Sequence, residues 1–389
     1  MGIKIGLVGL GAFAQDFVPL YKAHPLVDEI TFCDLDAEKL ARNAAQHGIA
    51  KTSPSLDHLL TTDIDAAVII SQNWMHGPQA LQALRAGKHV YSAVPMGITI
   101  DEIGAIVRAV EETGQIYMMG ETSYYYPGAM YCREKVARGE FGHLVYAEGE
   151  YYHDWDHGLY DVMKWRGGEN WLKHAGSPPM HYPTHSTGQV ISVIGGYATH
   201  VSCHGFVDRK DDQVYRPDSN IWRNRFSNQT ALFTMSDGSC MRINEFRRCG
   251  HPGVERLAAV VGTEASFEQN VAGAAWLTKH TVENVTALLE CSGGHLGMAK
   301  SPDWGKFKVY DTVHPSERLP KAFLTQKNGH HGSHQFLVDD FLKACVEHKT
   351  PPVNAWAAAR YTIPGIVAHE SSIRDGERLA VPDFGDPKF

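Results

Sequence analysis

Three small residues and one carboxylate near the start of the chain have the spacing of a nucleotide-binding turn. Gly9, Gly11 and Ala14 follow a short apolar run and fill the positions of a Gly-x-Gly-x-x-Gly/Ala motif. Gly9 permits a tight turn, Gly11 lets the backbone approach a pyrophosphate, and Ala14 lets the following helix pack closely on the strand. Asp34 comes 34 − 9 = 25 residues after Gly9, close to the separation expected of a ribose-binding carboxylate. Together these residues predict a dinucleotide site.

Asp34 also indicates which dinucleotide binds. A carboxylate accepts hydrogen bonds from ribose hydroxyls and repels a 2′-phosphate, so Asp34 favours NAD over NADP. The alternative is that Asp34 only caps the helix that begins near Asp36.

A tyrosine and a histidine in the second half of the chain could exchange a proton. Tyr151 and His153 alternate along a predicted strand, so they project from one face while Tyr152 projects from the other. A phenol beside an imidazole can form a relay. The competing interpretation is an ordinary aromatic stack between strands.

A second pair surrounds the expected start of a helix. Tyr182 and His185 belong to Tyr-Pro-Thr-His, in which Thr184 is a candidate cap. An imidazole at a helix N-terminus tends to be neutral, which suits a base or a partner for a hydroxyl group. The alternative is a packed histidine bonded to a backbone carbonyl.

Other polar residues favour less specific interpretations. The chain has 22 His, with clusters at 152–157 and 330–334, but neither has the spacing of a defined metal site, and we expect no metal. Several cations are candidates for binding an anionic substrate group, although most such residues form solvated faces or ion pairs. They are Lys164, Arg166, Arg223, Arg225, Arg247 and Arg248.

The elements that must position these residues fall into two halves. Short β-branched runs alternate with helical patterns over the first half, with strands expected at 3–8, 30–33, 66–70, 89–92 and 116–119. This alternation predicts a doubly wound parallel sheet, a Rossmann domain, over residues 1–125. Helix 128–138 follows it.

The second half has the pattern of an α+β domain over residues 126–389. Runs 230–235 and 239–245 flank Ser-Asp-Gly, and run 254–261 precedes Gly-Thr-Glu, so both predict antiparallel hairpins in an open, mostly antiparallel sheet. Two helices are expected at 333–347 and 354–376. Because an open sheet face needs covering, we expect a homo-oligomer.

Composition excludes several classes of protein. The 389 residues are 43% hydrophobic and 21% charged, typical of a folded protein, and the net charge of −8 gives no basic surface for nucleic acid or a membrane. No apolar run approaches the ~20 residues that span a bilayer. No leader pattern precedes the first strand, so a cytoplasmic location is expected. The seven Cys lack Cys-x-x-Cys spacing and are expected to be reduced.

The chain resembles the Gfo/Idh/MocA family of NAD(P)-dependent sugar oxidoreductases. The likeness lies in the glycine motif, in 71–76 (Ser-Gln-Asn-Trp-Met-His), in 87–90 (Gly-Lys-His-Val) and in the open sheet after residue 140. It implies a carbohydrate substrate and an active site between the two domains. Residues that it implies for NAD, beside the motif and Asp34, are Ala12, Phe13, Ser71, Asn73, His76, Pro95, Glu121, Trp165 and Arg166.

One position departs from the family pattern. Dehydrogenases of the family carry Glu-Lys-Pro, with Lys as the acid/base, where this chain has Ala93-Val94-Pro95. Valine cannot exchange a proton. The chain instead resembles the NAD-dependent glycosidase branch of the family around 151–154 and 182–185. That likeness implies Tyr151, His153, Tyr182 and His185 as catalytic residues.

The reaction of that branch leaves NAD unconsumed. Hydride leaves carbon 3 of the sugar, the resulting ketone acidifies the proton on carbon 2, and elimination expels the group on carbon 1. Water then adds, and the hydride returns. Two alternatives stay open: a sugar or polyol dehydrogenase in which His185 replaces the missing lysine, and a non-catalytic NAD-binding regulator.

Overall fold

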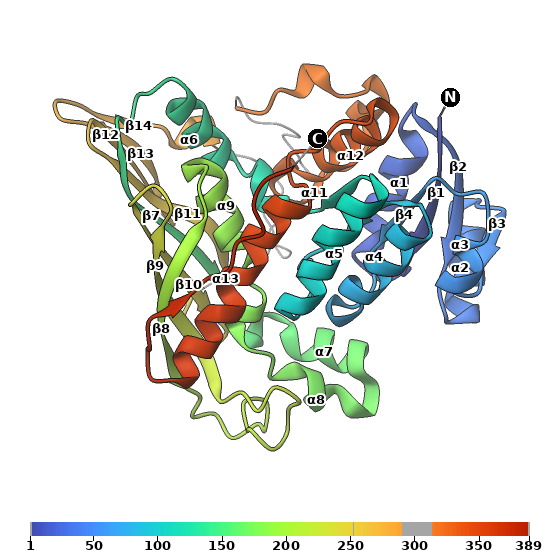
Figure 1. The fold of residues 1–389 in the computed structure, drawn as a ribbon, viewed down its shortest axis with the longest axis horizontal. Helices are drawn as coiled ribbons and strands as arrows, with labels where there is room; N and C mark the ends of the chain where they lie inside the picture. Colours follow the sequence, from blue (N-terminus) through green and yellow to red (C-terminus); the bar gives the residue numbers. More distant parts are fainter. Residues whose placement is uncertain (1, 252, 290–312, 388–389) are drawn as a thin grey trace. The chain divides into compact units, whose positions relative to one another are not determined.

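The computed structural model describes residues 2–251, 253–289 and 313–387, which form two compact units (Figure 1). The first comprises residues 1–122, 315–359 and 384–389, and the second comprises 123–314 and 360–383. The expected second domain, 126–389, differs from this division, since 315–359 and 384–389 join the first unit. The reason is packing: α12 (His334–Glu347) lies against α1 (Ala14–Ala23), and Phe341 of α12 contacts Tyr91.

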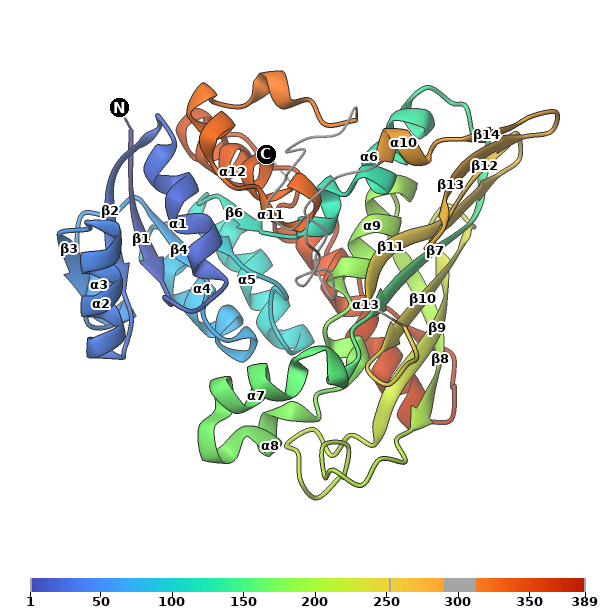
Figure 2. The same cartoon turned by 180° about the vertical axis from the view of Figure 1, so that it is seen from behind.

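The first unit contains the predicted parallel sheet. Its six strands have the order β3-β2-β1-β4-β5-β6, and Figure 2 shows helices packed against it. The short β3 was not expected, because its three residues include only one buried side chain and no apolar run. The strands are β1 (Ile3–Val8), β2 (Val27–Cys33), β3 (Lys51–Ser53), β4 (Ala66–Ile69), β5 (His89–Ser92) and β6 (Tyr117–Met119). The other helices are α2 (Ala37–His47), α3 (Leu56–Leu60), α4 (His76–Arg85), α5 (Ile100–Thr113) and α11 (Gly329–Gly332).

The second unit is built on a nine-stranded sheet of order β14-β13-β12-β11-β7-β10-β9-β8-β15. Every pair is antiparallel except β7 with β10. Both predicted hairpins are present, as β9–β10 and β11–β12. The strands are β7 (Leu144–Tyr152), β8 (Ala198–Val207), β9 (Phe226–Met235), β10 (Cys240–Phe246), β11 (Val254–Gly262), β12 (Ala265–Asn270), β13 (Gly273–Thr278), β14 (Val282–Asn284) and β15 (Leu379–Ala380).

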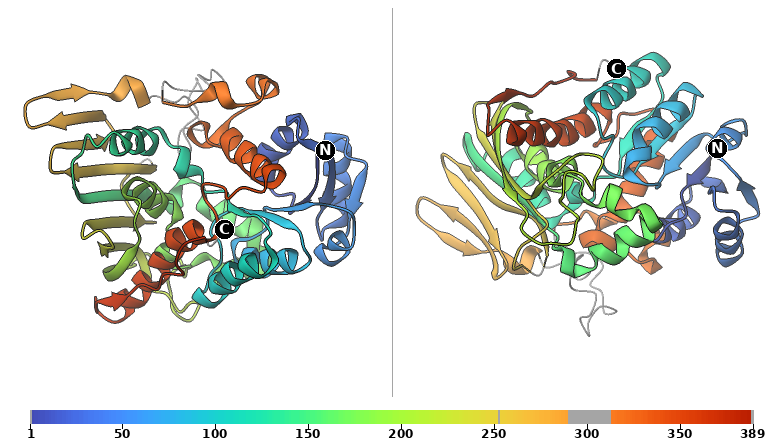
Figure 3. Two further views of the ribbon diagram at one scale, coloured as in Figure 1. Left: turned by 45° about the horizontal axis from the view of Figure 1, so that its top comes forward. Right: turned by 90° about the horizontal axis from the view of Figure 1, so that it is seen from below.

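Helices cover one face of this sheet (Figure 3). Helix α9 (Thr184–Ile194) packs on β7, β10 and β11, and α6 (Pro127–Ala137) packs on α9. The part of α13 (Ala355–Ile373) in this unit is tied to β9, where Gln229 bonds His369. On the other face Leu232 and Phe206 are about half exposed. The remaining helices are α7 (Leu159–Gly167), α8 (Trp171–Ala175) and α10 (Thr286–Leu289).

From the sequence we expect reduced cysteines and no membrane-spanning helix. The six cysteines within the described ranges are free, and Cys291 lies outside them. Over the same ranges, no helix combines the length and the apolar character needed to cross a bilayer.

Two histidines that pack on each other, one partly and one fully buried, make the second unit sensitive to acid. The rings of His181 and His369 lie 4.9 Å apart. Burial lowers the pKa of His181 to about 3 and that of His369 to about 4, against 6.5 in the unfolded chain. Protonation therefore favours unfolding, so stability is full above pH 6.5 and falls by about 1.4 kcal/mol per pH unit for each ring below it.

Urea denaturation between pH 7 and pH 5 measures this loss. The midpoint is expected to fall with pH, and less steeply in His181→Phe, whereas His280→Gln, which changes an exposed ring, keeps the wild-type slope. A midpoint independent of pH over this interval would refute the assignment.

Candidate active site

The glycine turn has the geometry that a pyrophosphate requires. Gly9 has φ of 88°, and a Cβ there would lie 2.6 Å from the carbonyl oxygen of Ile70, so only glycine fits. Helix α1 begins at Ala14, and no side chain within the described ranges caps it. Ala14 is fully buried, while Ala12 is exposed. A turn in which Gly9 and Gly11 carry no side chain, and which opens a helix, fits an anionic cofactor.

Asp34 links this turn to the start of α2. Its Oδ2 accepts from the Leu10 N–H at 2.9 Å and pairs with the Lys39 ammonium at 3.0 Å. Asp36, not Asp34, caps α2, because its carboxylate accepts from the Lys39 N–H at 3.0 Å. The capping alternative for Asp34 is therefore wrong. The ion pair with Lys39 was not expected, and it neutralises part of the charge that would repel a 2′-phosphate.

Asp34→Ala is expected to weaken NAD binding by roughly 1.5–3 kcal/mol, the scale of a hydrogen bond to a charged group, or about 10- to 150-fold in Kd. Calorimetric titration measures this. Asp36→Ala is the matched control, because it removes only a helix cap and leaves NAD affinity unchanged. Equal affinity of the unmodified protein for NAD and NADP would overturn the role of Asp34.

Several other residues expected to hold NAD are placed at the ends of strands β4 and β5. The ring of His76 is buried, with Nδ1 2.9 Å from the Pro95 carbonyl and Nε2 3.1 Å from the Ser71 carbonyl. The Ser71 hydroxyl donates to Gln79 at 2.6 Å. The His76 ring therefore lies between the two loops and contacts both. Asn73 begins a short 3-10 helix, and Glu121 is fully buried.

The remaining candidates for NAD lie in different surroundings. The Phe13 ring packs edge-on against His330 and His334, which bond each other at 2.8 Å. Two members of the histidine cluster at 330–334 therefore have a packing role. Trp165 and Arg166 lie on exposed positions of α7 in the second unit. Across the described part of the chain, no group of three or more His, Cys, Asp or Glu could hold a metal ion.

The structure brings the four expected catalytic residues together in the second unit. The Tyr151 hydroxyl and His153 Nδ1 are 3.1 Å apart. The His185 ring centre lies 5.3 Å from those of both Tyr151 and Tyr182, and the two tyrosine rings are 6.3 Å apart. We refer to Tyr151, His153, Tyr182 and His185 as the tetrad.

Strand β7 and helix α9 position the tetrad. The His153 N–H donates to the Phe246 carbonyl at 2.9 Å, which continues the β7–β10 ladder, while Tyr152 stacks on the Phe246 ring on the opposite face. The expected alternation is therefore present. Helix α9 begins at Thr184, so the prediction of Thr184 as its cap is wrong; Pro183 takes that position.

Burial controls the protonation of Tyr151. Its side chain is buried, and this burial, together with the charge of Glu255, raises the pKa of Tyr151 well above its usual value, although Arg247 lowers it. Tyr151 is therefore a neutral phenol near pH 7 and can donate a proton. His185 is also buried, at 5% exposure, so the pair is shielded from water.

Two carboxylates that were not expected from the sequence lie beside the tetrad. Glu245 on β10 and Glu255 on β11 both lie opposite Tyr151 in the sheet register. Arg247 lies over the Tyr151 ring, with its guanidinium carbon 4.5 Å from the ring centre, and pairs with Glu245 at 2.9 Å. Their position beside Tyr151 could have been predicted only from knowing that β7 pairs with β10 and β11.

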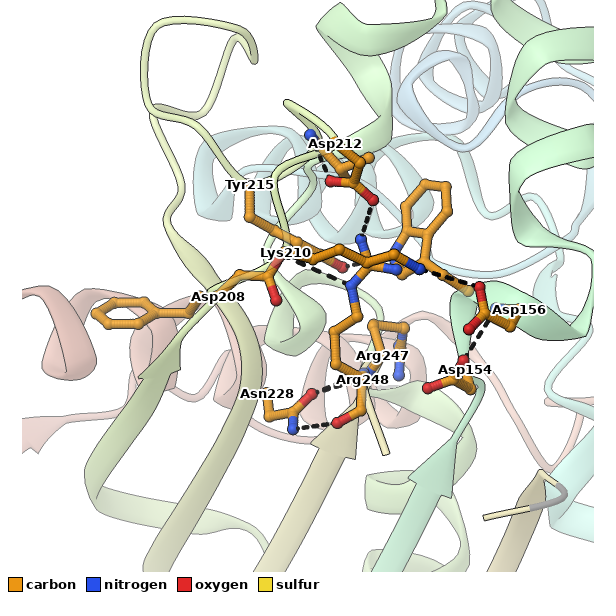
Figure 4. A network of polar contacts seen from close by, with 12 residues as sticks. Asp154, Asp156, Asp208, Lys210, Asp212, Tyr215, Asn228, Arg247 and Arg248 are labelled. Atoms are coloured by element: carbon orange, nitrogen blue, oxygen red, sulfur yellow. Dashed lines mark hydrogen bonds and ion pairs between the residues drawn. The ribbon is translucent and has the colours of Figure 1, made fainter. Parts of the chain in front are cut away.

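The neighbouring Arg248 anchors a different part of the unit (Figure 4). It pairs with Asp212 and Asp208, and its guanidinium carbon lies 5.5–5.8 Å from the centres of three aromatic rings, those of Trp155, Tyr160 and Tyr215. The Asn228 Oδ1 accepts from the N–H groups of both Arg247 and Arg248, at 3.0 and 2.9 Å. Both arginines therefore already have carboxylate partners.

Two family models match the chain. An oxidoreductase family model of an NAD-binding Rossmann fold matches residues 3–121, and a model of the C-terminal alpha/beta domain of the same Gfo/Idh/MocA family matches residues 133–380. The first unit thus contains an NAD-binding Rossmann domain.

Relatives and solved structures extend this likeness over the whole chain. A glycosyl hydrolase family 109 protein of Saccharopolyspora erythraea is 24% identical over 403 residues, covering 98% of this chain and 83% of the relative. A levoglucosan dehydrogenase solved with NADH has a TM-score of 0.76 at 17% identity, covering 99% of this chain and 100% of the other. A scyllo-inositol dehydrogenase of Lactobacillus casei, with NAD(H) and scyllo-inositol, has a TM-score of 0.70 at 15% identity, covering 98% and 99%.

Proposed function

This chain belongs to the Gfo/Idh/MocA oxidoreductase family, and we propose that it is an NAD-dependent glycosidase that oxidises carbon 3 of a sugar transiently. The observation that carries the proposal is the tetrad. Its phenols and imidazoles meet in one place, while the family's proton-carrying lysine is replaced by the buried Val94. The glycosyl hydrolase family 109 name of the relative supports the same activity.

The cofactor would be held by the first unit. The Gly9–Ala14 turn fits its pyrophosphate, and Asp34 suits its ribose. Bound NAD supplies a hydride acceptor that takes hydrogen from a sugar carbon and returns it to the same carbon.

The tetrad would move the protons. Oxidation at carbon 3 makes the carbon 2 proton acidic, and we assign its removal to His185, a buried imidazole between two phenols. The Tyr151–His153 pair would carry the proton of the carbon 3 hydroxyl, since a phenol bonded to an imidazole can pass a proton along it. Tyr182 would hold the His185 ring in place.

The substrate would be a neutral sugar rather than a uronate. Arg247 and Arg248, two of the cations considered for an anionic group, are already paired with Glu245 and with Asp208 and Asp212. A substrate carboxylate would have to displace a buried partner, at a cost that such pairs seldom repay.

A screen of nitrophenyl glycosides without added NAD tests the proposal. Release of nitrophenol from a neutral glycoside is expected, together with NAD in the mass spectrum of the denatured protein, because a cycle without net oxidation has no need to release the cofactor. Absence of cleavage across the panel would contradict the glycosidase proposal. Accumulation of NADH with a free sugar or polyol would then separate a dehydrogenase from a regulator that binds NAD without turnover.

A dehydrogenase is the second candidate. The solved structures named above are dehydrogenases, and His185 could replace the missing lysine as the base for a hydroxyl proton. Such an enzyme would accumulate NADH with a free sugar or polyol.

The assembly we propose is a homo-oligomer. The face of the large sheet opposite α9 carries Leu232 and Phe206, which are 53% and 48% exposed, and a second copy would cover them. Light scattering is expected to give a multiple of 43.1 kDa, and Leu232→Glu to shift it toward 43.1 kDa. A wild-type protein of 43.1 kDa would exclude this assembly.

A further inference from the structure

A buried ion pair lies directly beside the tetrad and has no role in the scheme above. Glu245 is 0% exposed and its Oε2 accepts from Arg247, which lies over the Tyr151 ring. Arg247 also donates to the Phe246 carbonyl at 3.1 Å, so its guanidinium is fixed in place. Burying two charges is costly, and such a pair is weak evidence for stability by itself. Because the pair lies against Tyr151, it can influence the charge on the Tyr151 phenol.

The other oxygen of Glu245 reaches the helix that carries His185. The Ser186 hydroxyl lies within hydrogen-bonding distance of Glu245 Oε1 and also 2.8 Å from the Pro183 carbonyl oxygen. A hydroxyl has one hydrogen, and both of these oxygens are acceptors when Glu245 is ionised. Both contacts become full hydrogen bonds when Glu245 carries a proton, because it then donates to Ser186 while Ser186 donates to Pro183.

We propose that Glu245 is a positioning residue whose protonation state sets how much of the Arg247 charge acts on the Tyr151 phenol. When Glu245 is ionised, it balances Arg247, and Tyr151 keeps its proton. When Glu245 is protonated, the guanidinium stabilises negative charge on the Tyr151 oxygen. The use of Tyr151 in turnover rests on the proposed function, but its coupling to Glu245 does not.

The electrostatic surroundings support this coupling. Burial raises the pKa of Glu245 to about 7, although Arg247, Ser186 and His185 lower it. Burial is the largest cause that raises the pKa of Tyr151, followed by Glu255, and ionised Glu245 raises it further. The groups that face Glu245 come from several segments. They are Tyr151 on β7, Ser186 and His185 on α9, Gln229 on β9 and Arg247 just after β10, with Glu255 on β11 beyond Tyr151.

The test is the ultraviolet titration of tyrosinate in the NAD-bound protein, with Tyr151→Phe subtracted to isolate Tyr151. Glu245→Gln removes the negative charge permanently, so we expect Tyr151 to ionise at a lower pH than in the wild type. Glu245→Asp is expected to restore much of the wild-type titration. Glu148→Gln is the matched control, because Glu148 also pairs with an arginine, Arg242, but from the opposite face of β7, and it should shift nothing.

Two further measurements complete the test. In the wild type, carboxyl-carbon NMR is expected to show one glutamate that titrates near pH 7, and this signal should be absent from Glu245→Gln. If Glu245→Gln does not fold, the wild-type titration alone still tests whether a glutamate titrates near pH 7. If the glycosidase is active, Glu245→Gln should flatten the pH dependence of kcat near pH 7 with KM changed less than twofold.

The titration requires no substrate, so it separates this inference from the proposed function. A shifted Tyr151 in a protein that cleaves no glycoside would keep the coupling and refute the glycosidase. An unshifted Tyr151 in Glu245→Gln, an equal shift in Glu148→Gln, or the absence of a glutamate titrating near pH 7 would each refute the coupling.

Discussion

His185→Ala is expected to lower kcat for glycoside cleavage by about 10²- to 10⁴-fold, the contribution of a positioned general base. The imidazole lies 5.3 Å from the ring centres of Tyr151 and Tyr182, and Tyr151 cannot replace it, because this buried phenol holds its proton near pH 7. Steady-state kinetics with the glycoside identified in the screen measure the loss.

NAD content should stay at the wild-type level in His185→Ala, because His185 is not among the residues expected to hold NAD. His143→Ala, which removes an exposed imidazole just before β7, is the control and should retain full activity. A loss of less than fivefold in His185→Ala would remove this residue from the mechanism.

Gly149→Ala is expected to cost on the order of 10²-fold in kcat, the scale of a misplacement of about 1 Å at a catalytic group. A Cβ at Gly149 would lie 2.6 Å from the backbone oxygen of Ser186, so β7 and α9 would have to separate. Because β7 carries Tyr151 and α9 carries His185, their separation breaks the tetrad without changing any of its members.

Kinetics and thermal unfolding of Gly149→Ala should both show the change, since the helix also loses packing. Gly250→Ala is the control: a Cβ there meets no atom within 4 Å, so it should alter neither. Full activity of Gly149→Ala would mean that the spacing of β7 and α9 does not set the geometry of catalysis.

The sequence predicted the elements that local patterns specify. Five strands of the parallel sheet and both hairpins of the second unit lie where alternation and turn residues placed them. The helix 334–347 was found, but its place in the first unit was not, since local periodicity does not say which unit a helix packs on.

The candidate site was likewise predictable only where local sequence patterns specify it. Tyr151 and His153 share a face because strand periodicity requires it. Glu245 and Glu255 are 94 and 104 residues from Tyr151 (245 − 151 and 255 − 151), and they reach it through the pairing of β7 with β10 and β11. No pattern within a single segment specifies which strands become neighbours.

The central claim is that a sugar is oxidised at carbon 3 and restored within one turnover, with a proton lost from carbon 2 in between. Cleavage in deuterated water measures this most directly, by NMR of the released sugar and by the absorbance of reduced nicotinamide. The account predicts deuterium at carbon 2 and no accumulation of NADH. Steady production of NADH with unlabelled carbon 2 would contradict it and identify the protein as a dehydrogenase.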